Sequence, residues 1–117
     1  HTLEEKIEDA NVLENEIHKN LGLIPEIAGR YRSTYFAHIF AGGYSSGYYS
    51  YLWTEVLDAD AFELFKEKGL FDAETANNLK TLIYSSGNTR DLMDQYRKFR
   101  GSDPKIEPLL ERRGLVD

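Results

Sequence analysis

The sequence predicts an all-α fold, a compact bundle of about five or six helices in a single domain spanning residues 1–117. Apolar residues recur at helical spacing in several segments, and no segment alternates with a period of two as a half-buried strand would. Helix-capping residues, glycines and prolines separate these segments by short connections. A chain of 117 residues is long enough for one domain with a modest core.

The first predicted helix starts near the N-terminus. Thr2 and Glu5 have the spacing of a capping box, and an apolar stripe then runs from Leu3 to Ile17 before Gly22 ends the helix. Pro25 predicts a non-helical elbow after it. The opposite face is acidic, and we expect it to be a solvated surface rather than a metal site. Its carboxylates are Glu4, Glu5, Glu8, Asp9 and Glu14.

A second, longer helix is predicted from about Ser46 to Gly69, with a bend near residues 58–60. One face of this helix is apolar and is expected to be core. Its residues are Tyr49, Leu52, Trp53 and Val56.

Three further helices follow. Asp72 is expected to cap the first, Asn88 or Thr89 the second, and Asp103 the third, with Pro104 at its first position. Gly101 is expected to end the second of these helices, and the third is expected to stop near Gly114.

Composition excludes several classes of function. The net charge of −6 argues against a nucleic-acid partner, which needs a basic surface. No apolar run approaches the ~18 residues of a membrane span, so no membrane partner is expected. The absence of a signal peptide favours the cytoplasm, with the periplasm as the alternative. His1 in place of a methionine indicates either the remnant of a tag or a chain cut from a longer protein.

Nucleophilic catalysis and metal binding by this chain have no support in the sequence. There is no cysteine and no nucleophile-elbow pattern around a serine. His18 and His38 have no ligand partner four residues away, so no metal site is predicted.

The stretch from Phe36 to Trp53 holds the chemistry that remains. In a continuous helix Tyr44, Tyr48 and Tyr51 would share one face, close to His38 and the flexible pair Gly42 and Gly43. Spacing alone leaves two interpretations open. Either the tyrosine rings are buried with their hydroxyls in contact with water, or the hydroxyls and the histidine donate hydrogen bonds to a developing oxyanion.

A short basic segment precedes this stretch. Arg30 and Arg32 are either surface arginines that meet the acidic helix, which spacing favours, or a clamp for a carboxylate.

Seven segments of the chain carry a resemblance to a known family: residues 30–40, 42–44, 47–53, 55–60, 86–91, 99–104 and the ending through Leu115. Through them, nearly the whole chain resembles the C-terminal part of the thimet oligopeptidase and peptidyl-dipeptidase family of zinc metallopeptidases. The likeness is weakest before Leu21, and the form of residues 30–40 is closer to the bacterial peptidyl-dipeptidase branch than to the animal oligopeptidases.

The resemblance implies roles for residues on one wall of a peptide-binding cleft. Tyr51 is similar to the tyrosine that donates to the oxyanion, and Tyr44 to its partner on the Gly42-Gly43 loop that closes over substrate. His38 is similar to the histidine that binds the substrate backbone, and Tyr48 to a third tyrosine of the cleft.

Zinc in that family is bound by a His-Glu-x-x-His helix and a downstream glutamate, and this chain has no such motif. The resemblance therefore implies that zinc and the general base lie upstream in a longer parent protein, that short peptides are the substrates, and that this chain alone is inactive. The alternative is a stand-alone, non-catalytic helical module that binds a peptide or itself. If the chain is a fragment whose catalytic part is missing, it is expected to self-associate, because part of the core and the tyrosine face would be uncovered.

Overall fold

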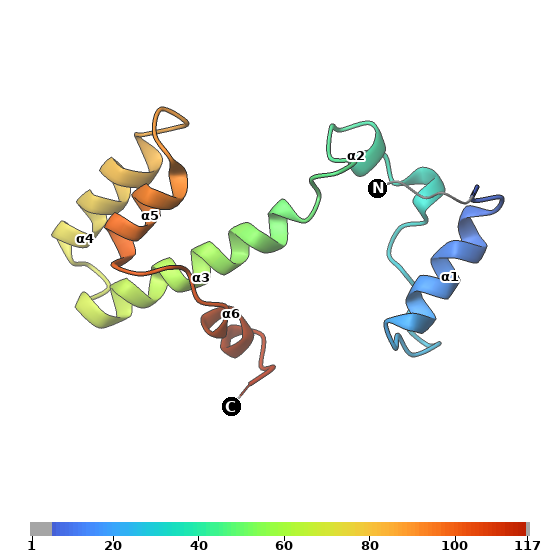
Figure 1. Cartoon of the computed structure of the whole chain (residues 1–117). Coiled ribbons are helices and arrows are strands. Elements are labelled where there is room, and N and C mark those ends of the chain that lie inside the picture. Colours follow the sequence, from blue (N-terminus) through green and yellow to red (C-terminus); the bar gives the residue numbers. More distant parts are fainter. Residues whose placement is uncertain (1–5, 117) are drawn as a thin grey trace. The chain divides into compact units, whose positions relative to one another are not determined.

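The computed structural model describes residues 6–116 and confirms the all-α class, since every regular element in that range is a helix (Figure 1). The chain divides into two compact units, one up to Tyr49 and one from Ser50 onward. We call them the N-terminal and C-terminal units and describe each by itself.

The N-terminal unit contains α1 (Ala10–Asn20), the 3₁₀ turn η1 (Ser33–Tyr35) and the short helix α2 (Ala37–Phe40). Asp9 caps α1 by accepting a hydrogen bond from the backbone N–H of Asn11 at 2.8 Å. The predicted earlier start is wrong for residues 6–9, because this cap fixes the first helical residue at Ala10. Thr2, Leu3, Glu4 and Glu5 lie outside the described residues.

Glu14 is the one buried residue in the described part of the N-terminal unit, with 8% of its surface exposed. Its carboxylate accepts hydrogen bonds from Arg32 Nη1 at 2.9 Å, Ser33 N–H at 3.0 Å and Ser33 Oγ–H at 3.1 Å. The prediction that Glu14 is solvated is therefore wrong, because three donors from a distant segment replace water. The interpretation that an arginine meets the acidic helix is confirmed for Arg32.

These contacts predict that the connection between α1 and η1 is lost at low pH. The Ser33 backbone N–H, followed by the Arg32 and Ser33 side chains, lowers the pKa of Glu14 below its ordinary value of 4.5, against the opposing effect of burial. A carboxylate whose pKa is lower in the folded than in the unfolded protein stabilises the folded state at pH values above its unfolded pKa. This stabilisation is lost as the pH falls through the pKa of the folded state. We expect hydrogen-exchange protection of the Ser33 amide to persist at pH 4.5 and to disappear below it. Loss of protection already above pH 4.5 would contradict this.

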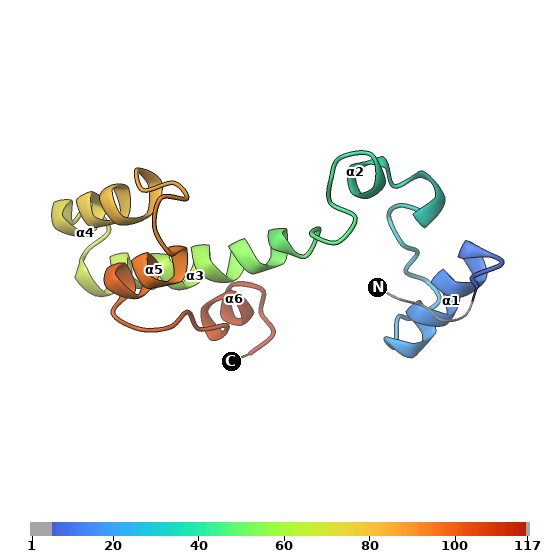
Figure 2. The ribbon, with the colours of Figure 1, turned by 45° about the horizontal axis from the view of Figure 1, so that its top comes forward.

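The C-terminal unit consists of α3 (Ser50–Lys68), α4 (Ala73–Asn78), the π-helical turn η2 (Leu79–Tyr84), α5 (Leu92–Arg100) and α6 (Glu107–Arg112). α6 packs against α3, and α5 packs against η2, which continues α4 (Figures 1 and 2). Val56 and Ala59 of α3 form the core cluster of buried side chains with Leu109 of α6. No helix within residues 6–116 has the length and apolar character needed to cross a bilayer.

Several predicted boundaries are confirmed. The Asp72 carboxylate accepts from Thr75 N–H at 2.7 Å and caps α4. Gly101 follows α5 with a left-handed φ of 84°, a conformation that glycine adopts without steric cost.

Two predicted caps are wrong. α5 begins at Leu92 because Asp91, rather than Asn88 or Thr89, accepts from Asp94 N–H at 2.8 Å. Asp103 instead pairs with Arg97 Nε at 2.6 Å. α6 begins at Glu107, without a side-chain cap and with Pro108 in its first turn.

The predicted core face of the long helix is only partly correct. Val56 is buried, but Tyr49, Leu52 and Trp53 are exposed. The buried Leu109 of α6 meets α3 at Val56 and Ala59, so α6 covers this part of the predicted face. The helix continues through residues 58–60 as predicted, since α3 runs without a break from Ser50 to Lys68.

A buried polar network lies beside the apolar cluster. Asp60 is fully buried and accepts from the Tyr96 hydroxyl at 2.7 Å and from Arg100 Nε at 3.3 Å. Arg100 Nη2 also donates to Glu67 at 2.9 Å. Burial, then the hydrogen bond to Asp60, raises the pKa of the Tyr96 hydroxyl, so it stays a donor throughout the neutral range.

Candidate functional site

The predicted row of tyrosines on one helix face is wrong, because α3 begins at Ser50. Tyr44 and Tyr48 lie in the turns between α2 and α3, and Tyr51 lies in the first turn of α3. Gly42, Gly43 and Gly47 make helix costly in this connection, by about 1 kcal/mol per glycine relative to alanine.

The turns nevertheless bring together three of the predicted site residues, which we call the His–Tyr cluster: His38, Tyr44 and Tyr48. The centroid of the His38 ring lies 5.1 Å from that of Tyr44 and 5.3 Å from that of Tyr48. The two tyrosine rings are 6.1 Å apart, and all three pairs meet edge to face. Edge-to-face pairs of this kind each contribute about 0.5–1.5 kcal/mol beyond area burial, so they stabilise one arrangement of the three rings.

Further aromatic contacts join this cluster to the preceding basic segment. The Phe36 ring lies 5.2 Å from that of Tyr48 and stacks on Tyr31 at 4.8 Å. The Arg30 guanidinium lies over the Tyr31 ring, 5.4 Å from its centroid. Arg30 thus belongs to the same run of contacts as the cluster, whereas Arg32 is bound to Glu14.

The two predicted loop glycines have different structural reasons. A Cβ on Gly42 would lie 2.6 Å from the carbonyl oxygen of His38, a distance at which the backbone must move. Gly43 has a φ of +81°, which is strained for residues with a Cβ. The close turn after His38 therefore needs both glycines.

We expect Gly42→Ala to lower the stability of this segment. The added methyl pushes on the backbone of α2 rather than on a flexible side chain, so the His38 ring moves away from Tyr44 and Tyr48. The resonances of the His38 ring should shift in NMR spectra of the chain, because the ring leaves its edge-to-face contacts with both tyrosines. Gly47→Ala is the matched control, because a Cβ there meets nothing within 4 Å. Equal effects of the two changes would contradict the steric explanation.

Tyr51 belongs to the C-terminal unit and is 45% exposed. One turn further along α3, Glu55 pairs with Arg113, and Asp58 pairs with Arg112 at 2.9 Å. These two ion pairs connect the end of α6 to the same half of α3 that carries Tyr51.

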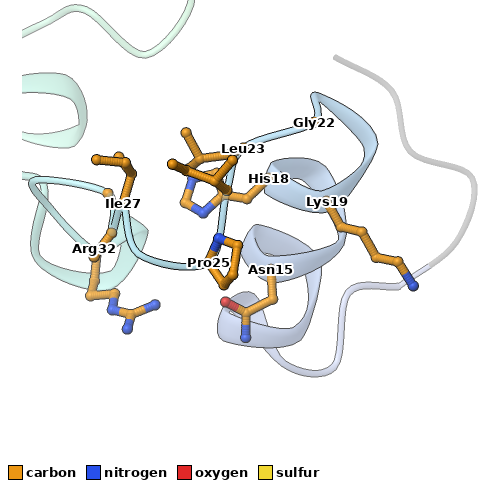
Figure 3. A pocket seen from close by; sticks show the side chains of 11 residues that line it. Asn15, His18, Lys19, Gly22, Leu23, Pro25, Ile27 and Arg32 are labelled. Atoms are coloured by element: carbon orange, nitrogen blue, oxygen red, sulfur yellow. The ribbon is translucent and has the colours of Figure 1, made fainter.

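One pocket was not predicted from the sequence. It has a volume of about 650 Å³ and lies between α1 and the loop that follows it. Figure 3 shows His18 and Asn15 from α1 beside Leu23 and Pro25, with Lys19 pointing away from the loop. The His18 ring packs so closely on Gly29 that a Cβ there would lie 3.1 Å from Cε1. Pro25 indicates a loop in the sequence, but no signal from neighbouring residues predicts that this loop lies against α1.

Within residues 6–116 no group of three or more histidine, cysteine, aspartate or glutamate side chains is arranged to hold a metal ion.

Comparison with known proteins identifies the family. A model described as Peptidase family M3 matches residues 1–115. A dipeptidyl carboxypeptidase of Escherichia coli (strain K12) is 50% identical over 92 residues, which cover 79% of this chain and 14% of the relative. The dipeptidyl carboxypeptidase of Salmonella typhimurium is 43% identical over 98% of the chain and 17% of the relative. Oligopeptidase A of Escherichia coli is 44% identical over 91% of the chain and 16% of the relative. The chain thus spans about a sixth of these relatives, and the resemblance seen in the sequence is confirmed.

Proposed function

Because the chain belongs to peptidase family M3, we propose that it is the C-terminal portion of a zinc-dependent oligopeptidase or peptidyl-dipeptidase that hydrolyses short peptides. Residues 1–117 would serve as one helical segment of a larger fold. The observation that carries the proposal is the His–Tyr cluster, since His38, Tyr44 and Tyr48 meet on a turn that requires glycine.

Tyr51 and Tyr44 are the proposed oxyanion donors. When water attacks a peptide carbonyl, negative charge develops on the carbonyl oxygen, and a phenol hydroxyl is a neutral donor suited to that oxygen. Tyr44 lies directly after Gly43, so a small change at the glycines moves its hydroxyl toward or away from a bound peptide.

His38 and Tyr48 are proposed to bind the substrate. The His38 imidazole donates to the peptide backbone, and the Tyr48 ring, held against His38 and Phe36, lines the cleft. Gly42 and Gly43 let the loop backbone approach the peptide closely. Arg30 or Arg32 is proposed to face the C-terminal carboxylate of the substrate. Arg30 is the better candidate, because Arg32 Nη1 is already bound to Glu14.

Zinc and the general base are proposed to belong to the remainder of the parent protein. When bound there, zinc supplies an activated water as the nucleophile. The chain described here supplies hydrogen-bond donors and substrate contacts only, so by itself it is expected to be inactive and to bind no zinc. The exposed apolar side chains of the C-terminal unit, including Trp53 and Phe71, support self-association when the rest of the parent is missing. The cytoplasm is the proposed compartment, with the periplasm as the alternative.

The proposal is tested with the natural reading frame that encodes this chain. We expect it to continue upstream into a His-Glu-x-x-His motif, and the full-length protein to cleave short peptides in a reaction that a chelator stops and zinc restores. A natural frame without that motif, giving a protein that binds peptides or itself but cleaves nothing, would favour the non-catalytic module instead.

A further inference from the structure

We propose that Glu14 is a positioning residue for the peptide-binding site, because it anchors the segment that places His38 and Tyr48. The role of these two residues rests on the proposed function. The anchoring of the segment rests on contacts within the N-terminal unit alone.

The first step is the strength of the anchor. Glu14 lies on the middle of α1 and is separated from its partners by 18 and 19 positions in the chain. Three hydrogen bonds converge on its carboxylate, one from a guanidinium, one from a backbone N–H and one from a hydroxyl. Charge-assisted hydrogen bonds are about twice as strong as neutral ones. No other residue of the described part of this unit is buried, so this carboxylate is its most enclosed contact.

The second step is the connection from the anchor to the His–Tyr cluster. Ser33 opens η1, which is closed by a hydrogen bond from Tyr35 N–H to Arg32 C=O at 3.1 Å. Phe36 directly follows, and its carbonyl accepts from the backbone N–H groups of Ile39 and Phe40 at 3.1 and 3.2 Å, which opens α2. The same residue places its ring against Tyr48. A shift at Ser33 therefore reaches Phe36 within three residues, and from there both the helix that carries His38 and the ring of Tyr48.

The third step is the chemical requirement at position 14. All three partners are donors, and a carboxylate offers only acceptors. Glutamine keeps the size but replaces one oxygen with an NH₂ group, which would face either Arg32 Nη1 or the Ser33 donors. Glu14→Gln should therefore release the segment with little change in volume.

The test uses the full-length peptidase, with Glu16→Gln as the matched control on an exposed position of the same helix. We expect Glu14→Gln to raise KM for a short peptide about tenfold, because the substrate contacts of His38 and Tyr48 move, and to lower kcat by a smaller factor, because Tyr44 packs on both of them. A double-mutant cycle separates positioning from a general loss of structure. The rise in KM caused by Glu14→Gln should be clearly smaller in a His38→Ala background, where only Tyr48 is left to move, than in a Tyr51→Phe background. Equal effects in both backgrounds would overturn the inference.

A second readout does not depend on activity. In protein with selectively labelled histidine, the His38 ring resonance should shift in Glu14→Gln and stay in place in Glu16→Gln. If the resonance shifts but His38→Ala hydrolyses peptides normally, the proposed role of His38 fails while the anchoring by Glu14 stands. An unshifted resonance overturns the anchoring itself. If Glu14→Gln does not fold, Ser33→Ala removes one donor and leaves the ion pair, and it should give the same pattern with about a threefold rise in KM.

Discussion

Replacing Tyr51 with phenylalanine in the full-length peptidase is expected to lower kcat by about a hundredfold and to leave KM within about threefold of the original. The change removes a single hydroxyl from the first turn of α3, and 45% of the side chain is exposed, so folding is little affected. A donor to the oxyanion acts mainly in the transition state, and its loss therefore appears in kcat rather than in substrate binding.

The matched control is Tyr49→Phe, which removes the same hydroxyl two residues earlier from a ring that is 73% exposed. It should leave both constants unchanged. A Tyr51→Phe enzyme with normal kcat would remove Tyr51 from the proposed chemistry, and a rise in KM alone would reassign it to substrate binding. Steady-state kinetics with one short peptide under matched conditions distinguishes these outcomes.

Local signals in the sequence predicted what depends on neighbouring residues. The cap at Asp72 and the end of α5 at Gly101 need only a side chain or a conformational freedom within one turn of the chain, so both are readable from a few letters. Local signals gave the wrong cap where several capping residues lie close together. Asp91 caps α5 instead of Asn88 or Thr89, because its carboxylate accepts from the N–H of Asp94.

Contacts between distant residues could not be predicted in this way. Glu14 has the periodicity of a solvated acidic face, and only the return of Arg32 and Ser33 to α1 makes it buried. The exposure of Leu52 and Trp53 has the same origin, since their apolar character predicts burial but not which element covers them.

The candidate site shows both cases. The residues His38, Tyr44 and Tyr48 were predicted, and the structure does bring them together. The predicted geometry was wrong, because a shared helix face requires helix through Gly47 and the structure has turns there. The three side chains lie close together because their rings contact one another across those turns, and not because they share a helix face.

The largest stability effect is expected in the C-terminal unit, where Arg100→Ala should lower the free energy of unfolding by about 3 kcal/mol. Asp60 is fully buried and has two partners, the Tyr96 hydroxyl at 2.7 Å and Arg100 Nε at 3.3 Å. Without Arg100, the carboxylate still accepts the hydrogen bond from Tyr96, but its negative charge has lost its ion-pair partner. An uncompensated buried charge costs several kcal/mol, whereas the outer contact of Arg100 with exposed Glu67 contributes little.

Arg97→Ala is the matched control, because Arg97 is on the same helix and forms ion pairs with Asp94 and Asp103 that are all solvent-exposed. Urea unfolding of the chain followed by helical circular dichroism should show a large shift of the midpoint for Arg100→Ala and a much smaller one for Arg97→Ala. Adding Asp60→Asn to Arg100→Ala should recover part of the loss, since the amide removes the buried charge and can still accept from Tyr96. If Asp60→Asn made Arg100→Ala worse, the cost would come from lost packing of the arginine stem rather than from the unpaired carboxylate.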